Sequence, residues 1–115
     1  MITDFNVKKG PVEISAIKKI IQCEIRGIDP NTKFIHISSI DTNKYDNGDT
    51  IYFIYENYNN YEPLNKDSTF IVSINQKEKF NKFNNLIFVN DVHSSVAKLS
   101  AIFYREINEL DNDSL

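Results

Sequence analysis

The sequence predicts a single α/β domain, in which a small mixed sheet of about five short strands is flanked by helices. Short runs rich in β-branched and aromatic residues alternate with helical patterns in the second half of the chain, as in strands joined by helices. A length of 115 residues suits one domain with one core. No internal repeat or low-complexity tract interrupts this pattern.

The first third of the chain predicts an extended lead, a helix and a strand. The lead, "FNVKKGP" at 5–11, ends in a Gly-Pro pair that stops regular structure. Residues 12–23, "VEISAIKKIIQC", predict a short amphipathic helix because four isoleucines recur at helical spacing. These isoleucines are Ile14, Ile17, Ile20 and Ile21. A short strand at 23–27 follows and ends at Gly27.

The middle of the chain predicts two strands separated by polar loops. After a turn at 28–33, "FIHISSI" at 34–40 alternates apolar and polar residues and predicts a strand. Residues 41–49 are a loop with an Asn47-Gly48 turn signal. "TIYFIY" at 50–55 is dense in β-branched and aromatic residues and predicts a buried strand.

The next segment is polar and returns the chain to the sheet. Residues 56–67 predict a turn or a short helix that stops before Pro63. "STFIVSI" at 68–74 predicts another strand. Residues 75–85 predict a short polar helix with Phe80 and Phe83 on one face.

The last part of the chain predicts a fifth strand and a long amphipathic helix. The strand is "LIFVN" at 86–90, and the helix spans 91–110. One helical stripe is expected to consist of Val92, Val96, Leu99, Phe103 and Leu110. Residues 111–115 predict a frayed acidic tail.

Charge and composition argue against several classes of protein. A net charge of −3 does not favour a nucleic-acid surface, which needs a basic stripe. The start of the chain has no signal-peptide pattern, and no apolar run is long enough for a membrane span, so we expect a cytoplasmic protein without membrane contact. The single cysteine, Cys23, lies among apolar residues and is interpreted as a buried structural thiol.

No self-contained active site is evident. The two histidines, His36 and His93, lack a second histidine at metal spacing, and both are interpreted as surface or capping residues. No phosphate-binding glycine loop and no G-x-S-x-G turn occur. The carboxylates of Asp46, Asp49 and Glu56 are interpreted as solvated. We therefore expect no catalytic residue, no metal and no cofactor.

Residues 49–63, "DTIYFIYENYNNYEP", combine aromatic rings with amide side chains. Rings offer stacking faces to a nucleobase, and an Asn amide can pair with the adjacent N–H and C=O groups of uracil. This composition allows a nucleobase slot on the turn that follows a strand. The alternative is that the rings are core residues of a sheet, which is the commoner role of an aromatic strand.

Three segments resemble the N-terminal domain of UDP-3-O-acylglucosamine N-acyltransferase, an enzyme family of lipid A biosynthesis. They are "FNVKKGPVEISAIKKIIQCEIRG", "HISSIDTNKYDNGDTIYFIYENYNNY" and "LIFVNDVHSSVAKLSAIFY". They resemble, in order, the family's aromatic and Gly-Pro opening with a helix, its "GDISFL.NPKY" segment, and its closing strand, turn and helix. The resemblance covers roughly residues 5 to 104, and it implies that residues 1–110 form a UDP-sugar-recognition domain.

In that family a Phe and a Tyr sandwich the uracil, and an Asn between them reads its edge. The resemblance places Phe53 at the family Phe, because it follows "GDTIY". The family spacing falls on Glu56 and Asn59, whereas two one-residue insertions make Asn57 and Tyr61 the counterparts. Tyr58 is an alternative second ring. The implied substrate-binding residues are therefore Phe53, Asn57, Tyr61 and Tyr58.

The family's catalytic histidine lies on a hexapeptide-repeat β-helix, and this chain has no such repeat. The resemblance thus implies a domain that binds a UDP-acylglucosamine-type nucleotide sugar but is inactive alone. An acyl carrier protein is implied as a partner only through the missing catalytic part. The full-length family is trimeric, and a monomer is expected for this chain.

Two alternatives remain open. The chain is in one case a non-catalytic interaction module that keeps the fold without binding nucleotide. In the other it is a related uridine-recognising domain, as found at the front of UDP-sugar-dependent ligases of wall synthesis.

Overall fold

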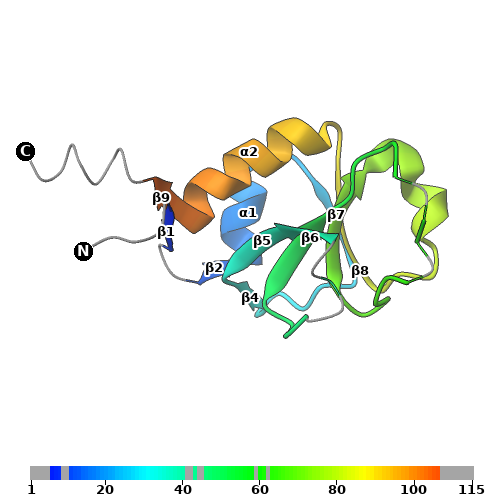
Figure 1. Ribbon diagram of the computed structural model, residues 1–115, viewed down its shortest axis with the longest axis horizontal. Coiled ribbons are helices and arrows are strands. Elements are labelled where there is room, and N and C mark those ends of the chain that lie inside the picture. The colour runs from blue at the N-terminus through cyan, green and yellow to red at the C-terminus, as the bar shows by residue number, and fades with distance from the viewer. Residues whose placement is uncertain are drawn as a thin grey trace, which may run out of the picture.

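The centre of the molecule is a five-stranded sheet (Figure 1). The computed structural model describes residues 6–8, 11–40, 43, 46–58, 60–61 and 63–106. Across the sheet, the strands follow the order β3 (Glu24–Arg26), β8 (Asn85–Val89), β7 (Thr69–Ser73), β6 (Thr50–Phe53) and β5 (His36–Ser39). The chain is a single α/β domain with a mixed sheet and helices, so the predicted fold class is confirmed.

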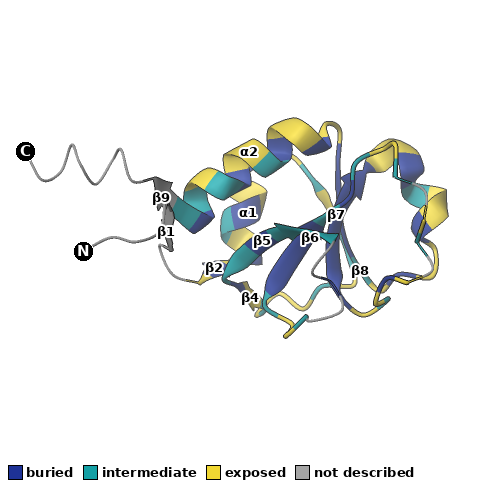
Figure 2. Ribbon diagram, in the orientation of Figure 1, coloured by how far each residue is buried: buried dark blue, intermediate teal, exposed yellow. Residues whose placement is uncertain are grey.

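The register of the sheet is parallel except at one edge. Strands β5, β6, β7 and β8 are parallel, with Ile51 opposite Ile37. Strand β3 is antiparallel to β8 and pairs Ile25 with Ile87. The central parallel strands β6, β7 and β8 are rich in apolar residues because both of their faces are buried, whereas the edge strand β5 is polar and mostly half-buried. Figure 2 shows the central strands mostly in the buried colour.

Alternate residues of these strands point into two different cores. The helix-side core contains Ile51, Ile71 and Ile87 of the sheet, and it is covered by α1 (Ile14–Ile20) and α2 (Val92–Phe103). The remaining buried members of the helix-side core are Val12, Ile14, Ile17, Ile21, Phe34, Ile37, Val89, Val92, Leu99 and Phe103.

The loop-side core lies on the opposite face of the sheet, because successive side chains of a strand alternate between faces. It is covered by η2 (Ile74–Phe80), a 3-10 helix, and by the connection from β6 to β7. Its buried members are Tyr52, Ile54, Leu64, Phe70, Val72, Phe80, Phe83, Leu86 and Phe88. Phe80 and Phe83 thus share one buried cluster, which confirms the predicted common face.

The predicted strand at 34–40 and the predicted helix at 12–23 are both wrong in extent. Residues 34–40 divide into β4 (Lys33–Phe34) and β5, because β4 pairs with β2 (Val12–Glu13) while β5 pairs with β6. The helix is therefore confined to α1, and the extended residues before it belong to β2. Pairing with a partner strand overrides the local pattern at both places.

The predicted helix at 91–110 is wrong at residues 104–106. Residue Tyr104 is extended, and β9 (Tyr104–Glu106) pairs antiparallel with β1 (Asn6–Lys8). Within α2, Val92, Leu99 and Phe103 are buried and Val96 is half-buried, as the stripe predicts. Leu110 and the predicted tail at 111–115 lie outside the described residues.

A hydrogen-bond network joins the loops at the amino ends of β6 and β7. The Tyr52 hydroxyl donates to Asp46 Oδ1 at 3.2 Å, and Ser68 Oγ donates to Asp46 Oδ2 at 2.6 Å. Asn43 Nδ2 donates to Ser68 Oγ at 3.0 Å, while Asn43 Oδ1 accepts from the Asn65 amide at 2.7 Å. Burial, followed by the charge of Asp46, raises the pKa of Tyr52 to about 12.

We expect the protein to lose stability between about pH 10 and pH 12. A folded-state pKa above the unfolded value means that the folded chain retains the Tyr52 proton longer, so the free energy of unfolding falls as the pH rises through this window. Urea unfolding at several pH values measures this dependence. Tyr52→Phe removes the titrating hydroxyl, and its unfolding free energy should fall less steeply above pH 10. Equal slopes for the two proteins would contradict the expectation.

Candidate functional site

The carboxyl ends of the parallel strands form the candidate site, because ligands in open α/β sheets bind outside these ends. Strand β6 ends at Phe53, β7 ends at Ser73 and β8 ends at Val89. The segments that follow are the turn after β6, the helix η2 and the helix α2. Aromatic and amide side chains are concentrated on these three segments.

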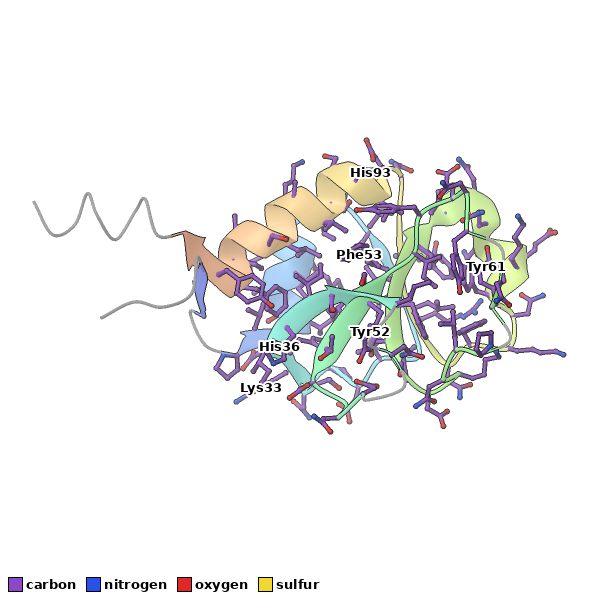
Figure 3. All side chains as sticks on the ribbon, in the orientation of Figure 1. Lys33, His36, Tyr52, Phe53, Tyr61 and His93 are labelled. Atoms are coloured by element: carbon purple, nitrogen blue, oxygen red, sulfur yellow. The ribbon has the colours of Figure 1, made fainter. Side chains whose placement is uncertain are left out.

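Three rings meet between the end of β6 and the start of α2. The rings of Tyr55 and His93 are stacked, with centroids 3.8 Å apart and planes inclined by 8°. Phe53 contacts Tyr55 at 5.2 Å with a tilt of 42°. Phe53 and Tyr55 are half-buried against the helix-side core, whereas His93 is exposed. Figure 3 shows His93 at the start of α2, above Phe53. We call Phe53, Tyr55 and His93 the ring cluster.

His93 lies at the start of α2, but its side chain does not cap the helix. Asp91 is the N-cap residue, and its Oδ1 accepts from the Ser94 amide at 3.2 Å. His93 therefore lies in the first turn, where its ring reaches Tyr55. The expectation of a surface position holds for His93, but the capping role belongs to Asp91, and the histidine ring is a stacking partner.

The turn after Tyr55 presents the candidate amide. The Tyr58 amide donates to the Tyr55 carbonyl at 3.0 Å, so that Glu56 and Asn57 lie exposed at the tip. Gln76 of η2 fixes this turn, because its Nε2 donates to the Glu56 carbonyl at 2.9 Å. The buried Oε1 of Gln76 has no hydrogen-bond partner among the described residues. Asn57 is therefore exposed on a turn with a fixed backbone, two residues after Tyr55 in the sequence.

Tyr61 and Tyr58 belong to the other face of the sheet. The Tyr61 ring lies 4.8 Å from Phe80 and 6.4 Å from Phe83, and it packs with Tyr58 against the loop-side core. Its hydroxyl donates to the Tyr58 carbonyl at 2.8 Å. Burial raises the pKa of Tyr61.

The structure therefore does not bring all four proposed substrate-binding residues together. Phe53 packs toward the helix-side core, whereas Tyr61 packs toward the loop-side core, so these two rings do not face each other (Figure 3). Asn57 lies on the turn between them. Asn59, the residue at the uninterrupted family spacing, lies outside the described residues.

A hollow of about 540 Å³ lies beside η2. Two of its three cationic side chains have partners: Lys77 pairs with Glu24, and Arg26 donates to the carbonyl of Phe80, whereas the third, Lys79, is exposed. Arg26 and Lys77 also lie over the Phe88 ring, each 5.3 Å from its centroid. These contacts attach the edge strand β3 to η2, so we interpret Arg26 and Lys77 as structural residues.

The described part of the chain assembles no metal site. No group of three or more His, Cys, Asp or Glu side chains there could hold a metal ion. His36 lines a hollow of about 290 Å³ at the β5 edge, remote from the ring cluster in Figure 3. Cys23 is half-buried rather than fully buried as predicted, and this partial burial raises the pKa of its thiol.

Neither protein-family models nor curated protein sequences yield a match for this chain. The helices among the described residues are all too short or too polar to cross a membrane.

Sequence reasoning missed Tyr55 and His93 as a pair. Tyr55 was grouped with the buried strand at 50–55, although β6 ends at Phe53. Two features of the sequence could have indicated the pair. Tyr55 comes just after the end of β6, and His93 lies in the first turn of the helix that follows β8. In a parallel sheet these two places lie at the same edge.

Proposed function

We propose that this chain is a uridine-nucleotide recognition domain of the kind that opens UDP-3-O-acylglucosamine N-acyltransferase, and that it binds the uridine part of a UDP-acylglucosamine-type sugar in the cytoplasm. The observation that carries the proposal is the ring cluster beside the Asn57 turn, at the edge of the sheet where ligands bind. Rings and an amide together suit a flat polar base.

The chemistry of the ring cluster matches uracil. Stacking of a base on an aromatic side chain contributes about 1–3 kcal/mol per base. The amide of Asn57 carries one acceptor oxygen and a donor NH2 group, which complement the N–H and C=O groups on one edge of uracil. Phe53 packs against Tyr55 from the sheet and supports that ring.

The proposed arrangement differs from the sandwich that the resemblance implies. Tyr61 and Tyr58 are occupied in the loop-side core, so Tyr55 takes the role of the stacking ring and Tyr61 supports the turn. We assign no catalytic residue to this chain. Acyl transfer and contact with an acyl carrier protein belong to the β-helix in the family that the chain resembles, and we propose a monomer for this domain.

An amide-resolved NMR titration with UMP and CMP tests the proposal. We expect saturable shifts at residues 53–58 and 91–94, with UMP bound more tightly than CMP.

Tyr55→Leu should weaken UMP binding by about 1–3 kcal/mol, because the stacking face is lost. Asn57→Asp should reduce the preference for UMP, because a carboxylate lacks the amide donor.

The matched control is Asn60→Asp, an exposed amide in the same connection. It adds the same charge and should leave the preference for UMP unchanged. If Asn60→Asp and Asn57→Asp weaken binding equally, the effect is general repulsion of the phosphate and Asn57 does not read the base.

An interaction module without nucleotide binding is the second candidate. It is favoured by the placement of Phe53 and Tyr61 on opposite faces of the sheet, which leaves no preformed sandwich. An absence of shifts at millimolar UMP would support this candidate.

A further inference from the structure

In the structure, the imidazole of His93 stacks on one face of the Tyr55 ring. His93 lies 3.8 Å from Tyr55 with an inclination of only 8°, which is the arrangement that a stacked base would adopt. Phe53 contacts Tyr55 at a tilt of 42° and does not stack in parallel. A base cannot take the His93 position while the imidazole remains there.

The two neighbours of Tyr55 differ in how freely they can move. Phe53 is the last residue of β6, paired in register with Ile71, and it packs against the helix-side core. His93 is exposed. Side chains of exposed residues change rotamer on a picosecond-to-nanosecond timescale. The imidazole is therefore the neighbour that can leave.

Rotation of His93 does not require α2 to unfold. The helix is capped by Asp91 through its contact with the Ser94 amide, and the Ser95 amide donates to the Asp91 carbonyl at 3.0 Å. Neither hydrogen bond involves the imidazole. Val92 and Ser95 form the buried side of the same turn, so the turn is anchored to the core without His93.

We propose that His93 covers the ligand face of Tyr55 in the free protein, and that a pyrimidine base binds by displacing the imidazole and stacking on Tyr55 in its place. The inference rests on the proposed uridine function and adds how the face of its stacking ring becomes available. Binding then selects the conformer with His93 turned away. The observed affinity is lowered by the fraction of molecules in which the face is covered.

The test compares UMP binding by the wild-type chain, His93→Ala and Tyr55→Leu, with His36→Ala as the matched control. His36 is the other histidine of the chain and lies on β5. We expect His93→Ala to bind UMP about 2- to 10-fold more tightly, because an aromatic pair of this strength no longer competes. His36→Ala should bind like the wild type, and Tyr55→Leu should bind weakly.

The imidazole signals of His93 report displacement directly in the wild-type chain. Stacking on Tyr55 shields its ring protons, and we expect saturating UMP to remove this shielding while the signals of His36 stay unchanged. Amide spectra of each variant verify that the fold is intact.

The possible outcomes separate the inference from the proposed function. If UMP binds but His93→Ala weakens binding or leaves it unchanged, the imidazole is a second stacking plate or a bystander, and the displacement inference is overturned while uridine recognition stands. If UMP binds only to His93→Ala, the inference is supported in its strongest form. If UMP binds to neither protein, the proposed function fails and the inference fails with it.

Discussion

Replacing Gly27 with Ala should lower the free energy of unfolding by about 2–5 kcal/mol. Gly27 has a φ of +80°, and an added Cβ would lie 1.7 Å from the carbonyl oxygen of Asn84. The left-handed conformation costs an L-residue about 1–2 kcal/mol, and the collision adds about 1–3 kcal/mol of overpacking. Both costs arise directly after β3, where the backbone of Gly27 lies against Asn84, the residue before β8. Urea unfolding followed by circular dichroism measures the change.

Gly48→Ala is the matched control for this prediction. Gly48 has a φ of +85°, but nothing lies within 4 Å of an added Cβ. Its replacement should therefore cost only about 1–2 kcal/mol, the conformational part. Equal destabilisation by the two substitutions would contradict the close approach of Gly27 to Asn84.

Phe80→Ala should lower the free energy of unfolding by about 3–5 kcal/mol, because it removes a fully buried ring from a packed core. The Phe80 ring contacts Tyr61 at 4.8 Å and Phe83 at 5.1 Å, so its loss opens a cavity in the middle of the loop-side core. Chemical denaturation again gives the measurement. Tyr61→Ala should also be destabilising, because Tyr61 packs in the same core.

The control for Phe80→Ala comes from the same 3-10 helix. Ile74 is 37% exposed, and Ile74→Ala should change the free energy of unfolding far less than Phe80→Ala does. A loss below about 1 kcal/mol for Phe80→Ala would mean that η2 does not pack on the sheet as the structure has it. It would also reopen the possibility that Tyr61 faces a ligand.

Local patterns were enough to predict the α/β class and the three central strands of the sheet. The strands β6, β7 and β8 were predicted within two residues at each end, because buried parallel strands require short apolar runs bounded by polar residues, and these segments have them. Phe80 and Phe83 were correctly assigned to one face, since their spacing alone brings them together on any helical turn. These features depend on neighbours that are close in sequence.

The candidate site depended on the direction in which the chain leaves β6. The sequence spacing allowed Phe53 and Tyr61 to face each other. In the structure, Ile54 packs in the loop-side core, and the connection that follows it lies on the same face of the sheet, where Tyr61 packs. Tyr55, one residue further, returns to the helix side and meets His93. Composition contains no information about this crossing.

The sequence was sufficient to establish the α/β class, the apolar faces of the strands and the aromatic and amide content of the turn, because burial periodicity and side-chain chemistry are local properties. The sequence could not predict pairing between distant segments. The helix α2 ends at Phe103 because the residues that follow it, β9, pair with β1 near the start of the chain. The ring cluster has the same origin. The parallel sheet brings the end of β6 and the start of α2 to one edge, and only that arrangement places the imidazole of His93 on Tyr55.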